Sequence, residues 1–332
     1  SEMCIRDRPD TIEINDDIRR LTSVVCHSLS DVPDIIDTLN EGKVADVEGY
    51  YENAKINRVY VDRVHVKKAF AEYTAAYNAD DPKIKLKIDH TYRVAALCER
   101  IAKAAGMCAY DVELAWLSGM LHDVGRFEQI KRYNTFSDAD SVDHAKFGAD
   151  LLFKDGLIST FLNGMVKCTG YKPGALEDRY SSDGVFLYDR LNKSDMEMLE
   201  LAIRCHNMYR IPQGLNRREQ AFCNVLRDAD KVDIFKVNID TPLEEIYNTT
   251  TEELMKSDIT DEVLEAFDEE HCILKAIRRT PADTVIGHVS LAYELVYDES
   301  VRITVEQGYL AKLMHFHSDN EETNRKMAMV RE

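Results

Sequence analysis

The sequence predicts an all-α protein. Almost every long segment repeats its apolar residues at helical spacing, whereas the alternating pattern of a strand is scarce. Val301 to Val305 is the one stretch with a tempting strand pattern, and it is short. The chain of 332 residues has only 7 prolines and 14 glycines, and no repeat or low-complexity linker separates two folding units. We therefore expect a helical bundle that carries additional N- and C-terminal helices.

Five helices are expected in the central part of the chain, each from an apolar stripe with its own start signal. The first runs from Asp89 to Gly106, which stops it after apolar residues spaced three and four apart. The second helix is expected to start at Asp111, the third at Ser141 and the fourth at Asp195. The fifth is indicated by an apolar stripe over Phe222–Ala229.

On this pattern the chain divides into four parts. Residues 1–8 have no start methionine and no signal-peptide core, so we expect a non-native leader there. A helical N-terminal extension is expected over 9–80, and a catalytic core over 81–244 that includes a polar, irregular loop from Gly164 to Asp195. Residues 245–332 are expected to form a C-terminal helical extension that packs on the core.

The charge of the chain limits its partners. Lys and Arg number 42 against 60 Asp and Glu, which leaves a net charge of −18. Such a surface repels phosphate backbones, which disfavours broad nucleic-acid binding and anionic membranes, but a small phosphorylated ligand remains possible in a positive or metal-loaded pocket. No apolar run approaches the ~18 residues of a membrane helix. Eight scattered cysteines without a CxxC pair favour reduced thiols in a cytoplasm.

Histidines and aspartates near the expected helix ends form the candidate site. The intervals between them are 22 residues or more, apart from one His-Asp doublet, which excludes a zinc finger and an HExxH helix. The side chains would have to converge from separate helices, as metal ligands in helix bundles do. The candidate metal ligands are His90, His122, Asp123, His144, His206 and Asp230.

Helical phase supports this convergence. His90 and His206 both fall on the apolar stripes of their helices. Asp230 lies four residues after the apolar Leu226, whereas Asp228 points well away, so Asp230 is the chosen ligand. A buried carboxylate or imidazole is costly unless it is paired or coordinated. Taken alone, each of these histidines is more often a hydrogen-bonded core residue; the joint pattern favours a metal site.

These motifs resemble those of the HD-domain metal-dependent phosphohydrolases. The resemblance runs from about Ile84 to Val237, and the order His, His-Asp, Asp is the minimal signature of the family. The family pattern implies a second metal at the two extra histidines. The stretches that carry the resemblance are Asp89-His90-Thr91-Tyr92-Arg93-Val94, Leu121-His122-Asp123-Val124-Gly125-Arg126-Phe127, Ser141-Val142-Asp143-His144-Ala145, Cys205-His206-Asn207 and Arg227-Asp228-Ala229-Asp230-Lys231-Val232-Asp233.

The motifs also distinguish subgroups. Cyclic-di-GMP phosphodiesterases carry a Gly-Tyr-Pro tripeptide, but Asn207-Met208-Tyr209 follows His206 here, so that subgroup is unlike this chain. The sequence is more similar to bacterial proteins with His-Asp-hydrophobic-Gly-Arg-Phe and Arg-Asp-Ala-Asp-Lys motifs.

The resemblance implies a metal-dependent phosphohydrolase. We expect cleavage of a phosphoester or phosphoanhydride bond of a small nucleotide by a metal-activated hydroxide, with Asp123 bridging two divalent ions. Imidazole and carboxylate ligands suit Fe, Mn, Co, Ni, Zn or Mg and do not select among them. The alternative is a nucleotide-sensing module that retains the metal site with little turnover. A nuclease acting on polymers is disfavoured by the charge. The exact substrate, monoesterase against diesterase activity and the oligomeric state stay open.

Arg126 is the predicted catalytic contact to the substrate. It follows the metal-binding doublet closely, its guanidinium can bind two phosphoryl oxygens, and Gly125 beside it would let a phosphate approach the backbone. The alternative is a salt bridge from Arg126 to Glu128 or another acid. Arg93 and Asn207 are further candidates for substrate binding, although each could equally be a surface or helix-capping residue.

Overall fold

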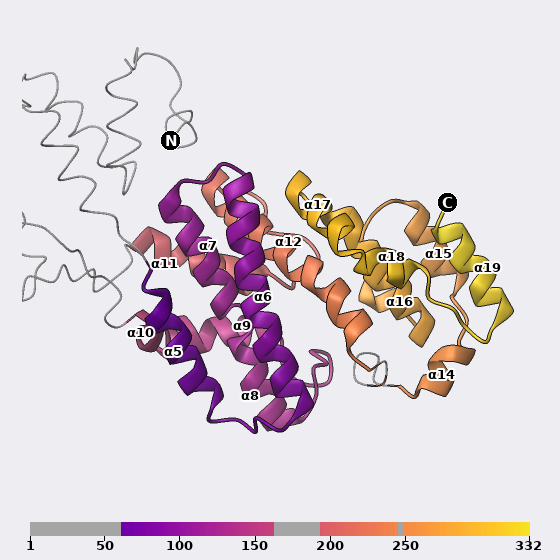
Figure 1. Ribbon diagram of the computed structural model, residues 1–332, viewed down its shortest axis with the longest axis horizontal. Coiled ribbons are helices and arrows are strands. Elements are labelled where there is room, and N and C mark those ends of the chain that lie inside the picture. Colours follow the sequence, from indigo (N-terminus) through magenta and orange to yellow (C-terminus); the bar gives the residue numbers. More distant parts are fainter. Residues whose placement is uncertain (1–60, 163–192, 243, 245–248) are drawn as a thin grey trace, which may run out of the picture.

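The fold is known from a computed structural model. All regular secondary structure in its described part is helical, which confirms the predicted fold class (Figure 1). None of the described helices is long and apolar enough to cross a membrane. The expected leader, most of the N-terminal extension and most of the loop after Gly164 lie outside the described residues, which are 61–162, 193–242, 244 and 249–332.

The first group of helices packs around one apolar core, which includes Phe70, Leu117 and Phe127. Two of its helices, α6 and α7, approach closely at Gly119, where an added Cβ would lie 2.6 Å from the Cα of Ala95. This group consists of α5 (Arg63–Thr74), α6 (Pro82–Ala104), α7 (Ala109–Leu121), α8 (Val124–Tyr133), α9 (His144–Ala149), the π-helical turn η1 (Asp150–Lys154), α10 (Ile158–Leu162), α11 (Lys193–Cys205) and α12 (Arg217–Asp240).

Several helices start elsewhere than the sequence predicted. The first predicted helix is α6, which starts at Pro82 instead of Asp89 because Asp81 caps it and proline fits its first turn. His90 therefore lies in the middle of this helix. Asp111 lies in the first turn of α7 and does not cap it. Asp143, not Ser141, caps α9, since its carboxylate accepts a hydrogen bond from the backbone of Lys146.

The second group of helices surrounds a separate apolar cluster that includes Ile286 and Met327. Phe235 of α12 also belongs to this cluster, so α12 serves both groups and runs between them in Figure 1. The stretch from Val301 to Val305 is helical and belongs to α17. The group consists of α14 (Thr251–Lys256), α15 (Asp261–Asp268), the 3-10 turns η3 (Lys275–Ile277) and η4 (Ser290–Glu294), α16 (Pro281–Val289), α17 (Asp298–Gln307), α18 (Tyr309–Met314) and α19 (Glu321–Val330).

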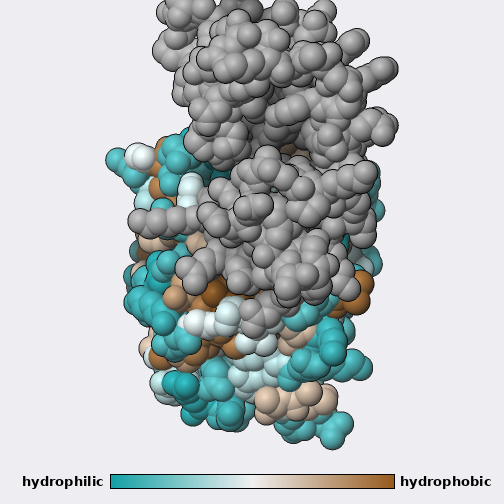
Figure 2. Space-filling model, turned by 90° about the vertical axis from the view of Figure 1, so that its left-hand side faces the viewer, coloured by the Kyte–Doolittle hydropathy of each residue, from teal (hydrophilic) through white to brown (hydrophobic). Residues whose placement is uncertain are grey.

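The division of the chain between residues 244 and 245 stays a prediction. The shared helix α12 makes contacts that connect the C-terminal helix group with the first one. Asp228 of α12 accepts hydrogen bonds from the backbone amides of Val296 and Tyr297. On the face shown in Figure 2, the described residues are mostly hydrophilic with smaller hydrophobic areas between them. Such a surface agrees with the 31% of charged residues in the sequence.

Candidate metal centre

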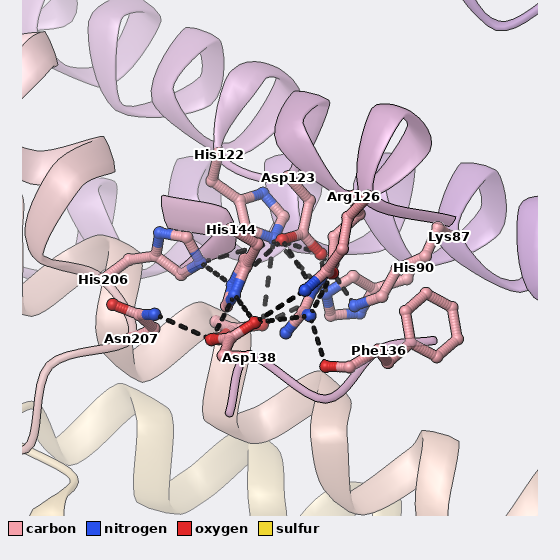
Figure 3. A network of polar contacts seen from close by, with 12 residues as sticks. Lys87, His90, His122, Asp123, Arg126, Phe136, Asp138, His144, His206 and Asn207 are labelled. Atoms are coloured by element: carbon pink, nitrogen blue, oxygen red, sulfur yellow. Dashed lines mark hydrogen bonds and ion pairs between the residues drawn. The ribbon is translucent and has the colours of Figure 1, made fainter. Parts of the chain in front are cut away.

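The structure brings the six predicted metal ligands together at the centre of the first helix group. Figure 3 shows five of them, which point toward one another from different elements. His90 comes from the middle of α6, and His122 and Asp123 lie between α7 and α8. The others lie at the first residue of α9, directly after α11 and within α12; these are His144, His206 and Asp230.

The ligand atoms fall into two groups that share Asp123. Its Oδ2 atom lies 3.5 Å from Nε2 of His90 and 3.4 Å from Nε2 of His122. Its Oδ1 atom lies 3.5 Å from Nε2 of His144 and 3.7 Å from Nε2 of His206. Each set of three ligand atoms lies within 4.8 Å of one another. One carboxylate thus faces a pair of histidines with each of its oxygens.

Hydrogen bonds fix which nitrogen of each imidazole carries its proton. Nδ1 of His122 lies 2.7 Å from the carbonyl of Gly119, and Nδ1 of His206 lies 2.7 Å from the carbonyl of Ile203. A carbonyl oxygen can only accept, so both Nδ1 atoms donate and both Nε2 atoms expose a lone pair when neutral. His144 turns its Nδ1 toward an acceptor too, the carboxylate of Asp138, at 2.8 Å.

The resulting arrangement fits divalent cations. Nε2 atoms face one another across 3.3 Å between His90 and His122, and across 3.1 Å between His144 and His206. Oδ1 of Asp123 is buried and forms no hydrogen bond with any described residue. A buried carboxylate oxygen without a donor is costly, and imidazole nitrogens with lone pairs cannot supply one. A metal ion bound by these atoms would remove that cost.

Charged groups around the site shift the pKa values of its ligands. Burial raises the pKa of Asp123, but the Lys87 ammonium and the neighbouring imidazoles outweigh this effect and hold the pKa well below its usual value. Burial also raises the pKa of Asp230, but contacts with His90 and His122 lower it overall. Burial lowers the pKa of His206 to about 3, so this imidazole is neutral near pH 7. For Asp123, Asp230 and His206 these shifts favour the deprotonated forms that bind metal.

Asp230 and Asp228 occupy different environments, as their helical phase predicted. Oδ1 of Asp230 lies 3.1 Å from Nε2 of His90 and 3.8 Å from Nε2 of His122. The carboxylate of Asp228 turns away to the C-terminal group, where it binds the two backbone amides described above.

Arg126 lies beside the centre, but its guanidinium is engaged by the protein. Its NH1 group donates to Gln129, to the carbonyl of Phe136 and to Asp138, whereas its Nε lies 3.8 Å from Oδ1 of Asp123. The salt bridge considered as an alternative thus forms with Asp138. Nε of Arg126 is buried without a hydrogen-bond partner among the described residues.

The sequence suggested that Gly125 lets a phosphate approach the backbone, but this expectation is wrong. Gly125 packs against α9, and an added Cβ would lie 2.4 Å from the carbonyl oxygen of His144 and 2.7 Å from the nitrogen of Gly148. The glycine is needed because two backbones approach closely there.

Arg93 and Asn207 use their polar groups within the protein. Arg93 donates to both oxygens of Asp233, which accepts from Nδ1 of His90 at 2.6 Å. Asn207 donates to Asp138 and to Asp143. Both residues therefore hold carboxylates near the centre, and direct contact with a substrate stays a prediction for both.

Sequence reasoning gave no role at this centre to three charged residues, which are Lys87, Asp138 and the Asp233 that binds His90. Lys87 donates to Oδ2 of Asp123 at 2.7 Å, and Asp138 connects His144 with Arg126. Lys87 precedes His90 by three residues, which is one helical turn, so its position was predictable once the helix was extended to Pro82. Asp138 lies in the irregular connection 134–143, where no periodic pattern indicates which way a side chain points.

Four side chains beside the ligands are partly exposed to solvent. The histidines and Asp123 are at most 4% exposed. The side chains that reach the surface beside them are Asp230 at 14%, Arg126 at 13%, Lys87 at 18% and Asp138 at 22%. These four side chains are therefore the parts of the centre that solvent reaches most.

Comparison with known proteins agrees with this geometry. Residues 88–236 match the HD domain family, and this range contains all six predicted ligands. No curated protein and no solved structure matches the chain. The match concerns the domain as a whole, so the subgroup indicated by the sequence motifs stays a prediction.

Proposed function

Residues 88–236 are an HD domain, and we propose that this domain is a metal-dependent phosphohydrolase that acts on a small nucleotide. One observation carries the proposal: four imidazole nitrogens and two carboxylates converge, and the shared carboxylate has a buried oxygen without a hydrogen bond among the described residues. Two cations on such a centre would be neighbours, which is the arrangement that phosphoryl transfer uses.

The protein side chains prepare the centre for this chemistry. Metal ions held by these ligands would supply Lewis acidity and would lower the pKa of a bound water. Asp123 offers one oxygen to each pair of histidines, so it would be a ligand in both groups. The carbonyls of Gly119 and Ile203 fix the orientation of two imidazoles, so little rearrangement is needed when a cation binds.

The partly exposed cations beside the centre favour a small anionic substrate. Arg126 lies next to Asp123 at the accessible side, where a guanidinium can stabilise charge that develops on phosphoryl oxygens. The net charge of −18 opposes a long polyanion, because most of its phosphates would face an acidic surface. A nucleotide presents only a few charges and fits both conditions.

The direct test is hydrolysis by purified protein loaded with Mn²⁺ or Ni²⁺. Turnover of bis(p-nitrophenyl) phosphate indicates a phosphodiesterase, and turnover of p-nitrophenyl phosphate indicates a phosphatase. Asp123→Asn should abolish both activities, whereas Asp319→Asn, in the polar segment before α19, is a matched surface control. A nucleotide library analysed by mass spectrometry then identifies the substrate.

The second candidate is a nucleotide sensor with the same metal site. The Arg126 guanidinium is already bound to three acceptors in the protein, an arrangement that suits rigid binding as well as catalysis. Nucleotide binding that requires metal, without cleavage of any phosphoester or phosphoanhydride bond of the bound nucleotide, would establish the sensor and exclude the phosphohydrolase.

A further inference from the structure

Lys87 is a charged residue of the centre to which neither the sequence motifs nor the family match assigns a role. It lies on α6, one turn before His90, and its side chain is 18% exposed. We propose that Lys87 balances the charge of Asp123 when the centre holds no metal and becomes a ligand of a substrate phosphoryl group when metal is bound. The inference rests on the proposed function, because it names a residue that recognises the phosphate.

The first step is the position of the ammonium. Nζ of Lys87 lies 2.7 Å from Oδ2 of Asp123. The same oxygen faces Nε2 of His90 and of His122, so it belongs to one of the two groups of metal ligands. An ammonium and a divalent cation repel each other strongly at such separations in a buried site. Lys87 must therefore leave Oδ2 when a metal ion is bound there.

The second step is the position that Lys87 can take instead. Its Nζ already lies 5.5 Å from the centre of the Phe136 ring, and the guanidinium carbon of Arg126 lies 5.6 Å from the same ring. Cations are stable at an aromatic ring within about 6 Å. In Figure 3, Lys87, Arg126 and Phe136 lie at one end of the network, and Asn207 lies at the other. Lys87 can thus move a short way and stay beside the centre.

The third step is the kind of ligand that this end attracts. Of the four partly exposed side chains beside the centre, Asp230 and Asp138 carry negative charge, whereas Lys87 and Arg126 are cations that attract a phosphate. Arg126 is fixed by Gln129, Asp138 and the Phe136 carbonyl. The ammonium of Lys87 forms no other hydrogen bond or ion pair with the described residues than the contact with Asp123, so its three donors are free once that contact breaks. A phosphoryl oxygen is the matching acceptor.

The alternative is that Lys87 only compensates the charge of a buried carboxylate. Such a residue would stabilise the metal-free protein and would play no part once metal is bound. The two roles differ in their effect on phosphate affinity, which is measurable without turnover.

The experiment compares Lys87→Met with Lys85→Met. Lys85 lies on the same helix, and its exposed side chain forms no hydrogen bond or ion pair with the described residues. Calorimetry of Mn²⁺-loaded protein with inorganic phosphate measures the affinity. We expect the Kd for phosphate to rise about tenfold or more in Lys87→Met, the effect of one charge-assisted hydrogen bond, and to stay near wild type in Lys85→Met. Mn²⁺ should bind Lys87→Met at least as tightly as wild type, because a competing cation is gone.

Other outcomes are equally decisive. An unchanged Kd for phosphate, with a lower Tm of the metal-free variant alone, would overturn the proposal and leave Lys87 as a counter-ion. If Lys87→Met does not fold, Lys87→Arg keeps the charge and Lys87→Gln keeps a donor, and the proposal then requires tighter phosphate binding in the arginine variant. Phosphate binding that depends on Lys87 in a protein without hydrolytic activity would support the inference and contradict the phosphohydrolase. Hydrolysis together with normal phosphate binding in Lys87→Met would support the phosphohydrolase and contradict the inference about Lys87.

Discussion

The hydrogen bond at Nδ1 of each histidine in the centre determines how its Nε2 is oriented and what it can bind. His90 shows this: although burial and Lys87 lower its pKa, contacts with Asp230 and Asp233 raise it overall. In the metal-free protein this imidazole therefore retains a proton more readily than a free histidine does, and metal binding releases it. Asp233 is held in place by Arg93, so two residues outside the ligand set determine the orientation of one ligand.

The two aspartates of α12 provide the first prediction. Asp230→Asn should remove most bound metal and all metal-dependent hydrolysis, because an amide is a poor substitute for a carboxylate that faces two histidines. Asp228→Asn should retain metal and most activity but lower the Tm, because it weakens acceptors for the amides of Val296 and Tyr297. Elemental analysis, hydrolysis and thermal melts of both variants measure this. Equal metal loss in both variants would show that the assignment of the ligand is wrong.

Arg126 provides the second prediction. Arg126→Ala should lower kcat about 100-fold, since it removes a guanidinium beside the centre. It should also destabilise the protein by about 1–3 kcal/mol, because the Phe136 carbonyl and Asp138 lose their donor. Kinetics at constant metal content and denaturant titration separate the two effects. Full activity with reduced stability would limit Arg126 to a structural role, and Arg126→Lys should recover only part of the rate.

These residues show which parts of the centre could be predicted from the sequence and which could not. Helical phase was enough to separate Asp230 from Asp228, because the two lie on one regular helix with a clear apolar stripe. It could not reveal that Asp138 would accept from His144 and Arg126, since that residue lies in an irregular connection without a period. Lys87 was missed for a different reason: the helix was started seven residues too late, at Asp89 instead of Pro82.

Close contacts between helices keep the ligands in register. Gly119 lets α7 approach α6, and Gly125 lets α8 approach α9. The first contact positions His122 relative to His90, and the second positions Asp123 relative to His144. The sequence predicted the helices themselves because their stripes are strong, but not these approaches, which depend on which residues of two separate helices meet.

Gly125 therefore gives an element-scale prediction. Gly125→Ala should destabilise the protein by about 2–4 kcal/mol, because the new Cβ meets backbone atoms that cannot rotate away. His144 should be displaced, so metal bound by the second group of ligands should be lost first. Gly148→Ala is the matched control on the other side of this contact, since its Cβ would lie 3.0 Å from the backbone nitrogen of Gly125 and no closer to any other atom. Denaturant titration and elemental analysis of both variants measure the difference, and equal effects would contradict this account.

The C-terminal helix group gives a pH-dependent prediction through His288 of α16. Burial, Arg278 and Lys275 lower its pKa to about 3 in the folded protein, against about 6.5 in an unfolded chain. Between these values the unfolded state binds the additional proton, so stability is retained above pH 6.5 and falls as the pH is lowered toward 3. The effect should be about 3 kcal/mol at pH 4. His288→Gln should flatten this dependence; parallel stability curves for the two proteins would refute it.

At the scale of the whole molecule, the acidic surface and the metal centre act together. A net charge of −18 makes the folded chain repel itself and attracts cations to it. The six ligands come from helices that are far apart in the sequence, from His90 to Asp230, and the centre exists only when α6, α7, α9, α11 and α12 are packed. Metal binding is therefore coupled to folding of the whole first helix group.

This coupling leads to the last prediction. The purified protein should carry close to two transition-metal ions per chain, and removing them with a chelator should lower the Tm markedly. A ligand at about 1,000 times its Kd stabilises the folded state by about 4 kcal/mol per site. His144→Ala should keep about one ion, because the group formed by His90, His122 and Asp123 stays intact, whereas Asp123→Ala should lose both because this carboxylate is shared. Elemental analysis combined with thermal melts at fixed free metal measures count and stability together. A count of one ion that survives His144→Ala would mean that only the first group binds metal, and a Tm that does not respond to chelation would mean that the centre binds none.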